Sequence, residues 1–383
     1  MRILHVASFH GNIGDNANHA GFRPWFEGLL SQPVEWQEFE IRNVYRKTAS
    51  FGDAFVELAN AADLVVIGGG NYFELWVEQS PTGTSISIDG SDFAKIKRPI
   101  FFNALGVDEG QGASEQAVTR FRKFLGTLLG SRQYLVSIRN DGAGATLEKF
   151  GAGLPIDQVL RLPDGGFFAP YEARSPRHSE GGFTVAINLA GDMLDQRFPG
   201  GDRHNYESFL AEFAGAVDRL MSSGICSRVV LIPHIFSDVK VFADLLGKLP
   251  DAIRRERVRL AAYDAGDDAA RDAFGEYLAA DLVLAMRFHA NVVAIAHGVP
   301  TIGLVCYSQI ENVYAELDLV DYAVDVRLKG FSEKILSEAE RIACKSGRIA
   351  DDFGAARGRV NSLRDEAARP IKDWLKSHVL AIA

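Results

Sequence analysis

Residues 281–305, which read DLVLAMRFHANVVAIAHGVPTIGLV, constrain the fold more than any other stretch of the chain. Residues 282–286 are apolar, which is typical of a strand that is buried on both faces. An apolar helical pattern runs from there to His297, and the Gly and Pro that follow end it. Residues 301–305 then predict a second buried strand. The stretch is therefore a βαβ unit, which predicts a parallel sheet with a right-handed crossover.

Arg287 and His289 lie where the first of these strands ends and the helix begins. Ligands of open α/β sheets bind at this carboxyl edge, where a helix N-terminus also offers free N–H groups to an anion. An arginine adds a planar cation that binds carboxylate or phosphate, and a histidine adds a proton donor that works near neutral pH. The pattern predicts an anion site. Pairing of Arg287 with a structural carboxylate, and capping of the helix by His289, are the alternatives that the sequence leaves open.

Strands and helices alternate along the rest of the chain, and the alternation begins twice. The first series has strand-like runs at residues 3–8, 34–41, 62–67, 99–105 and 134–138. A polar segment with Pro and Gly follows at residues 169–182, and the pattern begins again at Phe183. A length of 383 residues also suits two domains of about 150–200 residues each. We therefore predict an α/β protein with two Rossmann-like, doubly wound domains.

We place the two domains at residues 1–170 and 171–330. The remaining residues, 331–383, are charged and helical in pattern, and Trp374 and Leu375 are available to dock a terminal helix. We expect this segment to pack back toward the first domain.

Two glycine-rich turns follow strands of the first predicted domain. They contain the candidate ligand-binding residues Gly11, Asn12, Gly14 and Asp15, and then Gly69, Gly70 and Asn71. Glycine allows a ligand to approach the backbone closely at the carboxyl end of a strand. The first turn has neither the GxGxxG spacing nor the lysine of a phosphate loop, so a simple tight connection remains the alternative. Because parallel strands end at one edge of a sheet, we expect both turns to border a ligand site.

Arg139 and His234 occupy the same kind of position, directly after the strand-like runs at 134–138 and 228–233. Arg139 is a second candidate for binding an anion, and its pairing with Asp141 is the alternative. His234 is a candidate ligand-binding histidine, and a satisfied structural histidine is the alternative.

The composition limits the class of ligand and the location of the protein. A formal net charge of −9 argues against general affinity for nucleic acid or an anionic membrane, so local arginines must hold an anion. Three cysteines without CxxC spacing predict neither a disulfide framework nor a metal site, which suits a reducing cytoplasm. The N-terminal MRILHVASF predicts a core strand and no signal peptide, and no apolar run is long enough to span a membrane. We expect a cytoplasmic protein.

Five motifs occur in a fixed order along the chain: GNIGD at 11–15, DLVVIGGG at 63–70, VSIR at 136–139, IPH at 232–234, and MRFHA at 286–290 with GVP at 298–300. Together they resemble the polysaccharide pyruvyltransferase family. The resemblance covers most of the chain, and the last motif is the most specific of the five. It implies a GT-B-like pair of domains with an interdomain cleft, the first on the acceptor side and the second on the donor side.

The same resemblance implies transfer of a pyruvyl group from phosphoenolpyruvate to a hydroxyl pair of a saccharide. The product would be a ketal, made in cell-surface or exopolysaccharide biosynthesis. Phosphoenolpyruvate would be the donor substrate, with no cofactor and no metal. The acceptor would be a saccharide, either free or lipid-linked, and a homo-oligomer is compatible with the sequence.

The resemblance also assigns roles to residues of this chain. Arg287 and His289 fall on the donor-binding pair, and Arg139 falls on a third anion-binding position. His289 is our candidate for the general acid, and Asp15 is a candidate to orient or deprotonate the acceptor hydroxyl. The other expected substrate-binding residues are Gly11, Asn12, Gly14, Gly69, Gly70, Asn71, His234 and Phe288.

The sequence departs from the family's pattern at three positions. Asn140 stands where an aspartate follows the first arginine, Asn71 stands where glycine is common, and no lysine occurs near Gln309, where one is usual. Two other functions therefore remain open. One is a GT-B glycosyltransferase that uses a nucleotide sugar, because the same architecture hosts both chemistries, and the other is a non-catalytic saccharide-binding relative.

Overall fold

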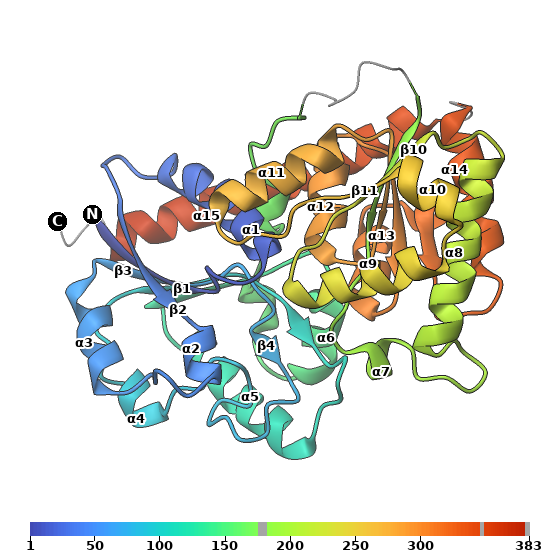
Figure 1. Cartoon of the computed structure of the whole chain (residues 1–383). Coiled ribbons are helices and arrows are strands. Elements are labelled where there is room, and N and C mark those ends of the chain that lie inside the picture. Colours follow the sequence, from blue (N-terminus) through green and yellow to red (C-terminus); the bar gives the residue numbers. More distant parts are fainter. Residues whose placement is uncertain (175–181, 345–347, 380–383) are drawn as a thin grey trace. The chain divides into compact units, whose positions relative to one another are not determined.

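The structure, a computed structural model, describes residues 1–174, 182–344 and 348–379 (Figure 1). The chain divides into two compact units. The first unit contains Met1–His10, His19–Gly165 and Val360–Ala383, and the second contains Gly11–Asn18 and Gly166–Arg359. The main division, between Gly165 and Gly166, comes a few residues before the expected boundary at 170/171. Residues 175–181 of the expected linker lie outside the described residues.

Two segments depart from the expected limits of the domains. Gly11–Asn18, which we expected in the first domain, belongs to the second unit. The segment 331–383 does not behave as one piece, because its first part belongs to the second unit and only Val360 onward belongs to the first. The reason is the length of α15 (Ile349–His378), a single helix that contributes residues to both units.

The first unit is built on a six-stranded parallel sheet with the order β2-β1-β3-β5-β7-β8. Its strands are β1 (Arg2–Ala7), β2 (Glu35–Glu40), β3 (Leu64–Gly68), β5 (Ile100–Leu105), β7 (Tyr134–Ile138) and β8 (Leu160–Arg161). Its helices are α1 (Ile13–Glu27), α2 (Arg42–Tyr45), α3 (Asp53–Ala61), α4 (Gly90–Phe93), α5 (Glu115–Leu129) and α6 (Ala143–Phe150), with a 3₁₀ turn at Ile156–Gln158. The direction of winding reverses between β1 and β3, which is where such sheets bind ligands.

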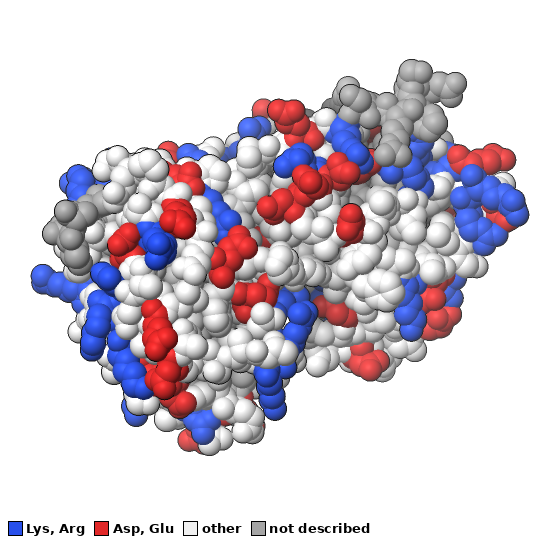
Figure 2. Space-filling model, turned by 60° about the vertical axis from the view of Figure 1, so that its left-hand side comes forward, with Lys and Arg blue, Asp and Glu red and all other residues white. Residues whose placement is uncertain are grey.

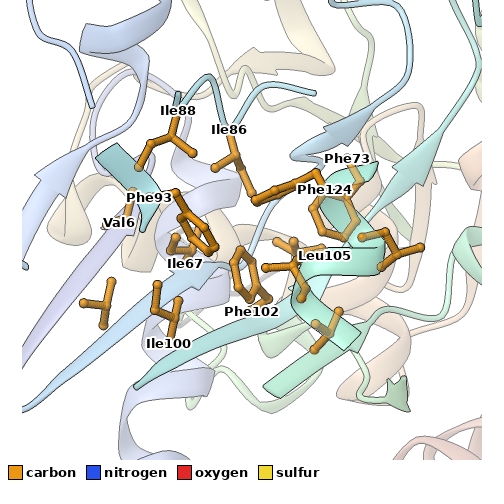
Figure 3. Close-up of a cluster of buried hydrophobic side chains, with 14 of the residues drawn as sticks. Val6, Ile67, Phe73, Ile86, Ile88, Phe93, Ile100, Phe102, Leu105 and Phe124 are labelled. Atoms are coloured by element: carbon orange, nitrogen blue, oxygen red, sulfur yellow. The ribbon is translucent and has the colours of Figure 1, made fainter. Parts of the chain in front are cut away.

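Apolar side chains cover both faces of this sheet, as two-sided burial of parallel strands requires. On one face, side chains of the strands pack against α3, α4, α5 and α6. Figure 3 shows part of this core, in which the rings of Phe102 and Phe124 lie 6.1 Å apart and Phe73 lies 6.4 Å from each. On the other face, Ile3 and Phe101 pack against α1 and the end of α15.

Two short strands stand apart from the main sheet of the first unit. They are β4 (Phe73–Glu74) and β6 (Val107–Asp108), which pair in parallel with each other. β4 follows β3 after the second glycine turn, and β6 follows β5 after Gly106. The carboxyl edge of the first sheet therefore carries a small second layer of strand.

The second unit contains another six-stranded parallel sheet, with the order β11-β10-β9-β12-β13-β14. Its strands are β9 (Thr184–Asn188), β10 (Arg228–Leu231), β11 (Val258–Leu260), β12 (Leu282–Ala285), β13 (Thr301–Val305) and β14 (Ala323–Asp325). This is the strand order of dinucleotide-binding Rossmann sheets, and its switch point lies between β9 and β12.

Helices flank the second sheet on both faces (Figure 1). They are α7 (Leu194–Arg197), α8 (Tyr206–Ser222), α9 (Phe236–Lys248), α10 (Asp251–Glu256), α11 (Asp267–Leu278), α12 (Phe288–Ala296), α13 (Ser308–Glu316) and α14 (Phe331–Ala343), with 3₁₀ turns at Gly165–Phe168 and Val320–Tyr322. The βαβ unit predicted at residues 281–305 is confirmed as β12, α12 and β13. The prediction of two Rossmann-like, doubly wound units is likewise confirmed.

Charged side chains of both signs are interspersed over the face drawn in Figure 2. Many of these charges are paired, as in Lys149 with Glu109 and Arg359 with Asp318. Within the described ranges, none of the helices combines the length and the apolar character that crossing a membrane requires.

Candidate functional site

Arg287 is held at the switch point of the second sheet by a buried asparagine. The backbone N–H of Arg287 donates to Oδ1 of Asn188, the last residue of β9, at 2.9 Å. The amide of Asn188 donates in turn to the carbonyl of Ile232, just beyond β10, at 3.0 Å. One side chain therefore joins the ends of three neighbouring strands, and it places Arg287 at the N-cap of α12.

The guanidinium of Arg287 binds two carboxylates. Nε donates to Asp238 at 2.7 Å, and Nη2 donates to both Asp238 and Asp192, the latter at 2.9 Å. Asp238 is fully buried and also accepts from the N–H groups of Gly191 and His234, so this pair is fixed. Asp192 is 36% exposed. The pairing that the sequence left open is present, while Nη1 makes no hydrogen bond to any residue that the structure describes.

Arg197 is a second buried arginine in this cluster, and the sequence did not single it out. Its Nε donates to the carbonyl of Asp192 at 2.9 Å, and its Nη1 lies 3.4 Å from Sγ of Cys306. Its guanidinium also stacks 4.7 Å from the centre of the Tyr307 ring. Burial alone would raise the pKa of Asp192, but Arg287 and Arg197 hold that pKa below its usual value. No local pattern predicts Arg197, because it ends α7, a helix of only four residues.

His289 lies in the first turn of α12 and packs against the glycine turn at the start of α1. Its side chain is largely buried, and a β-carbon at Gly14 would stand only 2.6 Å from its Nδ1. Asn12 shapes this turn, since its Oδ1 accepts from the N–H of Gly14 at 3.0 Å. Gly11 adopts a φ of 93°, which favours glycine. Within the second unit, the sequence motif GNIGD and His289 are therefore in direct contact.

Phe288 precedes His289, and its backbone N–H donates to the hydroxyl of Tyr307 at 3.1 Å. Tyr307 follows β13 and caps α13, which contains Gln309. The Tyr307 hydroxyl therefore accepts a hydrogen bond from one of the N–H groups in the first turn of α12, which have no partner within the helix. Burial raises the pKa of the Tyr307 hydroxyl, so this group stays protonated at neutral pH.

His234 follows β10 and is almost completely buried. Its Nε2 lies 2.9 Å from the hydroxyl of Tyr277, a residue of α11. Burial lowers the pKa of His234 well below its usual value, and the nearby Arg287 and His289 lower it further. This environment suits a neutral imidazole with a fixed position, which agrees with the alternative that His234 is a structural histidine. His234 nevertheless lies beside the Arg287 cluster.

In the first unit, Arg139 is buried at the end of β7 in an acidic environment. Its Nε donates to Asp141 at 2.6 Å, and its Nη1 lies 3.4 Å from Asp164. Asn140 contributes its Oδ1 to the backbone N–H of Asp164. Burial raises the pKa of Asp141, and the adjacent Arg139 opposes that shift. The pairing with Asp141 that the sequence left open is present here too.

The second glycine turn lies beside Arg139. Gly68 and Gly69 have positive φ angles, and a β-carbon at Gly68 would stand 2.1 Å from the carbonyl of Asn103. The carbonyl of Gly70 accepts from the N–H of Gly106 at 3.0 Å. A β-carbon at Gly106 would stand 2.3 Å from Oδ1 of Asn71 and 3.1 Å from Nη2 of Arg139. Glycine at 106 therefore allows Asn71 and Arg139 to come together.

The predicted site residues form two groups, one in each unit. The group in the second unit comprises Gly11, Asn12, Gly14, Asp15, His234, Arg287, Phe288 and His289, and the group in the first unit comprises Gly69, Gly70, Asn71 and Arg139. Across the part of the chain that the structure describes, no three His, Cys, Asp or Glu side chains are grouped so that they could hold a metal ion.

Comparisons with known proteins identify the family and the fold class of the chain. The sequence profile described as polysaccharide pyruvyl transferase matches residues 9–307. No curated protein sequence gives a significant match.

Similar solved structures include the UDP-GlcNAc 2-epimerase from Neisseria meningitidis bound to UDP-GlcNAc, with a TM-score of 0.57 and 11% identity over 97% of this chain and 100% of that chain. A glycosyltransferase from Rickettsia africae has a TM-score of 0.56 and 10% identity over 98% of both chains. MnaA from S. aureus with UDP has a TM-score of 0.55 and 11% identity over 98% of this chain and 97% of that one. At these identities the similarity shows the fold alone, which is the GT-B-like class.

Proposed function

Because the chain belongs to the polysaccharide pyruvyl transferase family, we propose that it transfers a pyruvyl group from phosphoenolpyruvate to two hydroxyls of one saccharide. The product of the proposed reaction is a cyclic ketal on a cell-surface or exported polysaccharide, or on its precursor. The proposed scheme needs neither a cofactor nor a metal, and we place the reaction in the cytoplasm.

The observation that supports this proposal most is the packing of His289 against Gly14. His289 follows the buried Arg287 by two residues. A transferase that uses an enol phosphate needs a proton donor for the enol carbon and a cation for the anionic groups. Histidine is the side chain that most often serves as a general acid or base. The ring of His289 is fixed on both sides, by α12 and by the glycine turn. We therefore assign the general acid to His289.

In the proposed sequence of steps, His289 protonates C3 of the donor, and positive charge develops at C2. One saccharide hydroxyl then adds to C2, the bond from C2 to the phosphate oxygen breaks, and the second hydroxyl adds. Of the two hydroxyl protons, one ends on the new methyl group through His289 and the other leaves with phosphate. Atoms and charges therefore balance without a further reactant.

We assign binding of an anionic group of the donor to Arg287. Its Nη1 makes no hydrogen bond to the described residues, and its Nη2 is shared with the partly exposed Asp192. The buried Asp238 keeps the guanidinium in place, whereas Asp192 is the partner that a donor anion can displace. In the first unit, Asn71, Gly69 and Gly70 are our candidates for the acceptor, and Arg139 remains a candidate for a further anion contact.

The proposal is tested by incubating the protein with phosphoenolpyruvate and methyl glycosides of glucose, galactose and mannose. We expect release of phosphate together with a glycoside that has gained a pyruvyl group, detected by mass spectrometry. His289→Gln should lower turnover by about a hundredfold or more while the melting temperature changes little. Stabilisation against heat by UDP-GlcNAc, with no consumption of phosphoenolpyruvate, would instead favour the glycosyltransferase alternative.

A further inference from the structure

Four neighbouring strands of the first sheet carry a polar residue at or near their carboxyl ends. In the order β1-β3-β5-β7 these residues are Ser8, Asn71, Asn103 and Asn140, and all four belong to the first unit. Asn103 lies within β5, and the other three follow their strands. Because parallel strands end at the same edge of a sheet, the four residues lie in a row along that edge. We refer to them as the polar row.

Every member of the polar row has a buried side-chain atom without a hydrogen-bond partner among the described residues. These atoms are Oγ of Ser8, Oδ1 of Asn71, Oδ1 of Asn103 and Nδ2 of Asn140. Ser8, Asn103 and Asn140 are only 3%, 1% and 4% exposed, and Asn71 is partly exposed. An unpaired buried polar atom is costly and needs an explanation such as a functional role or an ordered water. Four of them on adjacent strands indicate a binding site.

The backbone of β5 is distorted at the polar row. The pairing of β5 with β7 shifts in register between Phe102 and Leu105, and Ala104 has a φ of 43°, which is uncommon for residues other than glycine. The hydroxyl of Ser137 accepts from the N–H of Ala104 at 2.8 Å and donates to the carbonyl of Phe102 at 3.0 Å. Such irregularities occur beside binding sites, where they change the direction of a side chain. Asn103 lies inside this one.

Hydrogen bonds join the polar row to the second glycine turn. The N–H of Ser8 donates at 2.9 Å to the hydroxyl of Tyr72, the residue after Asn71. The carbonyl of Asn103 accepts from the N–H of Gly69 at 3.0 Å. Ends of β1 and β5 are therefore both attached to the turn that follows β3, which lies between them in the sheet.

Two of the three amides in the row have an orientation that their other contact fixes. Nδ2 of Asn71 donates to the carboxylate of Asp108 at 3.0 Å, so Oδ1 is the atom left without a partner. Oδ1 of Asn140 accepts from the N–H of Asp164 at 3.4 Å, so Nδ2 is the atom left. The row thus offers an acceptor at Asn71, a donor at Asn140, a second acceptor at Asn103 and a hydroxyl.

This combination selects the chemical class of the ligand. A carboxylate or a fully ionised phosphate cannot donate to the two Oδ1 atoms, and an ammonium group cannot accept from Nδ2 of Asn140. A sugar hydroxyl donates and accepts at once, and no side chain of the row is charged. We infer that the polar row binds the hydroxyls of a neutral saccharide. That this saccharide is the acceptor of the reaction rests on the proposed function.

The length of the polar row indicates the size of the saccharide. Ser8 and Asn140 are separated by three strand spacings, or about 14 Å, which is longer than one pyranose ring. The ligand that satisfies the whole row is therefore a disaccharide or a longer chain.

The test measures binding to the full-length protein without phosphoenolpyruvate. A glycan array of neutral mono- and oligosaccharides identifies the saccharide that binds best, and isothermal titration calorimetry gives its Kd. We expect oligosaccharides to bind more tightly than their component monosaccharides. Ser8→Ala and Asn103→Leu should each weaken binding of the selected saccharide by about three- to tenfold, because each removes one neutral hydrogen bond.

The melting temperature separates a binding role from a structural one. Replacing an unpaired polar group with an apolar group of similar shape is neutral or stabilising, so neither substitution should lower the melting temperature. Asn60→Leu, in α3, is the matched control. Asn60 donates to the carbonyl of Lys95 at 3.0 Å and accepts from the N–H of Lys97 at 2.8 Å. Its replacement should lower the melting temperature and leave the Kd unchanged.

The outcomes distinguish this inference from the proposed function. Binding to no glycan of the array, or equal Kd values for the wild type and both variants, overturns the inference even if pyruvyl transfer is observed. A melting temperature that falls as far in Asn103→Leu as in Asn60→Leu overturns it too, because the amide would then be satisfied within the fold, for example by water. Binding that depends on the row, in a protein that never consumes phosphoenolpyruvate, supports the saccharide site and overturns the proposed function alone.

Discussion

The imidazole of His289 leaves no room for a side chain at residue 14, because a β-carbon there would stand 2.6 Å from Nδ1 of His289. Real β-carbons do not approach another atom so closely, so Gly14→Ala must displace His289 or the turn. We expect turnover to fall by about a hundredfold, because a displacement of about 1 Å at a catalytic group has an effect of that size. Steady-state kinetics on the purified variant measures it.

Gly215→Ala is the control for this substitution. Gly215 lies in α8, is exposed, and has open space around its missing β-carbon. Alanine there should leave turnover unchanged and stabilise the helix by about 0.5–1 kcal/mol. If Gly14→Ala retained full turnover, the contact with His289 would have no part in the reaction.

The balance of charge around Arg287 gives a second prediction at this scale. Asp192 competes with an anionic ligand for Nη2 of Arg287 and also binds Arg197. Asp192→Asn removes a repulsion of about 1 kcal/mol, so phosphoenolpyruvate should bind about fivefold more tightly. Isothermal titration calorimetry measures the Kd, and Asp195→Asn, an exposed residue of α7, is the control. Weaker binding in Asp192→Asn would mean that Asp192 holds Arg287 in its active position.

The sequence could locate single residues at strand ends but could not choose between their alternatives. Arg287 and Arg139 both follow strands, as predicted, and both also pair with carboxylates. The partner of Arg287 is Asp238, which is distant in the chain, so only the folded structure reveals it. Arg197 escaped prediction because it lies in α7, which is too short to show a periodic pattern.

At the scale of elements, apolar runs predicted the central strands closely. The runs at 134–138 and 301–305 agree in both limits with β7 and β13. The short strands β4, β6, β8 and β14 were not predicted, because two or three residues show no periodicity. The helix α1 runs from Ile13 to Glu27 and contains Pro24.

The last part of α15 is an element whose docking can be tested. Trp374 packs with Phe101 against the first sheet, and its Nε1 donates to the carbonyl of Arg132 at 2.9 Å. Trp374→Ala should destabilise the protein by about 3–5 kcal/mol, because it leaves a cavity and an unpaired carbonyl. Urea unfolding followed by circular dichroism measures the loss. Lys372→Ala, two residues earlier on the exposed side, should stay within about 0.5 kcal/mol of the wild type.

At the scale of the whole chain, the restart of the strand–helix pattern at Phe183 predicted two units, and the structure divides the chain into two. The assignment of Gly11–Asn18 to the second unit could not be predicted. Local patterns connect this segment to β1, whereas its membership depends on contacts such as Asn16 with Asp267, which are far apart in sequence. Sequence periodicity carries no information about contacts of that kind.

Among the described residues, each unit has a fully buried histidine whose pKa is lowered, which predicts how stability depends on pH. In the first unit, Nδ1 of His5 accepts from Arg23 and Nε2 lies 3.3 Å from the carbonyl of Gly68, so the ring is held neutral. Burial lowers the pKa of His5 well below 6.5, and the charges of His19 and Arg23 lower it further. His234 is the corresponding residue of the second unit.

Above pH 6.5 these two histidines are neutral in both the folded and the unfolded chain, so their protonation does not change the free energy of unfolding. Below pH 6.5 the unfolded chain takes up protons that the folded chain does not, and stability falls by about 1.4 kcal/mol per pH unit for each histidine. Glu74 acts in the opposite sense, because its pKa is raised from 4.5 to about 7 and its contribution to stability is lost as pH rises between those values. Asp141, whose pKa burial also raises, acts in the same sense as Glu74, so the contribution of a histidine is measured by removing it.

The prediction is tested by urea unfolding between pH 7.5 and pH 5 for the wild type and for His5→Gln. The variant loses packing and should be less stable at pH 7.5, but its stability should fall less steeply below pH 6.5, because one of the two titrating groups is gone. His10→Gln, which removes an exposed histidine, should keep the wild-type slope. Equal slopes in the wild type and His5→Gln would show that His5 takes up its proton as readily in the folded chain as in the unfolded one.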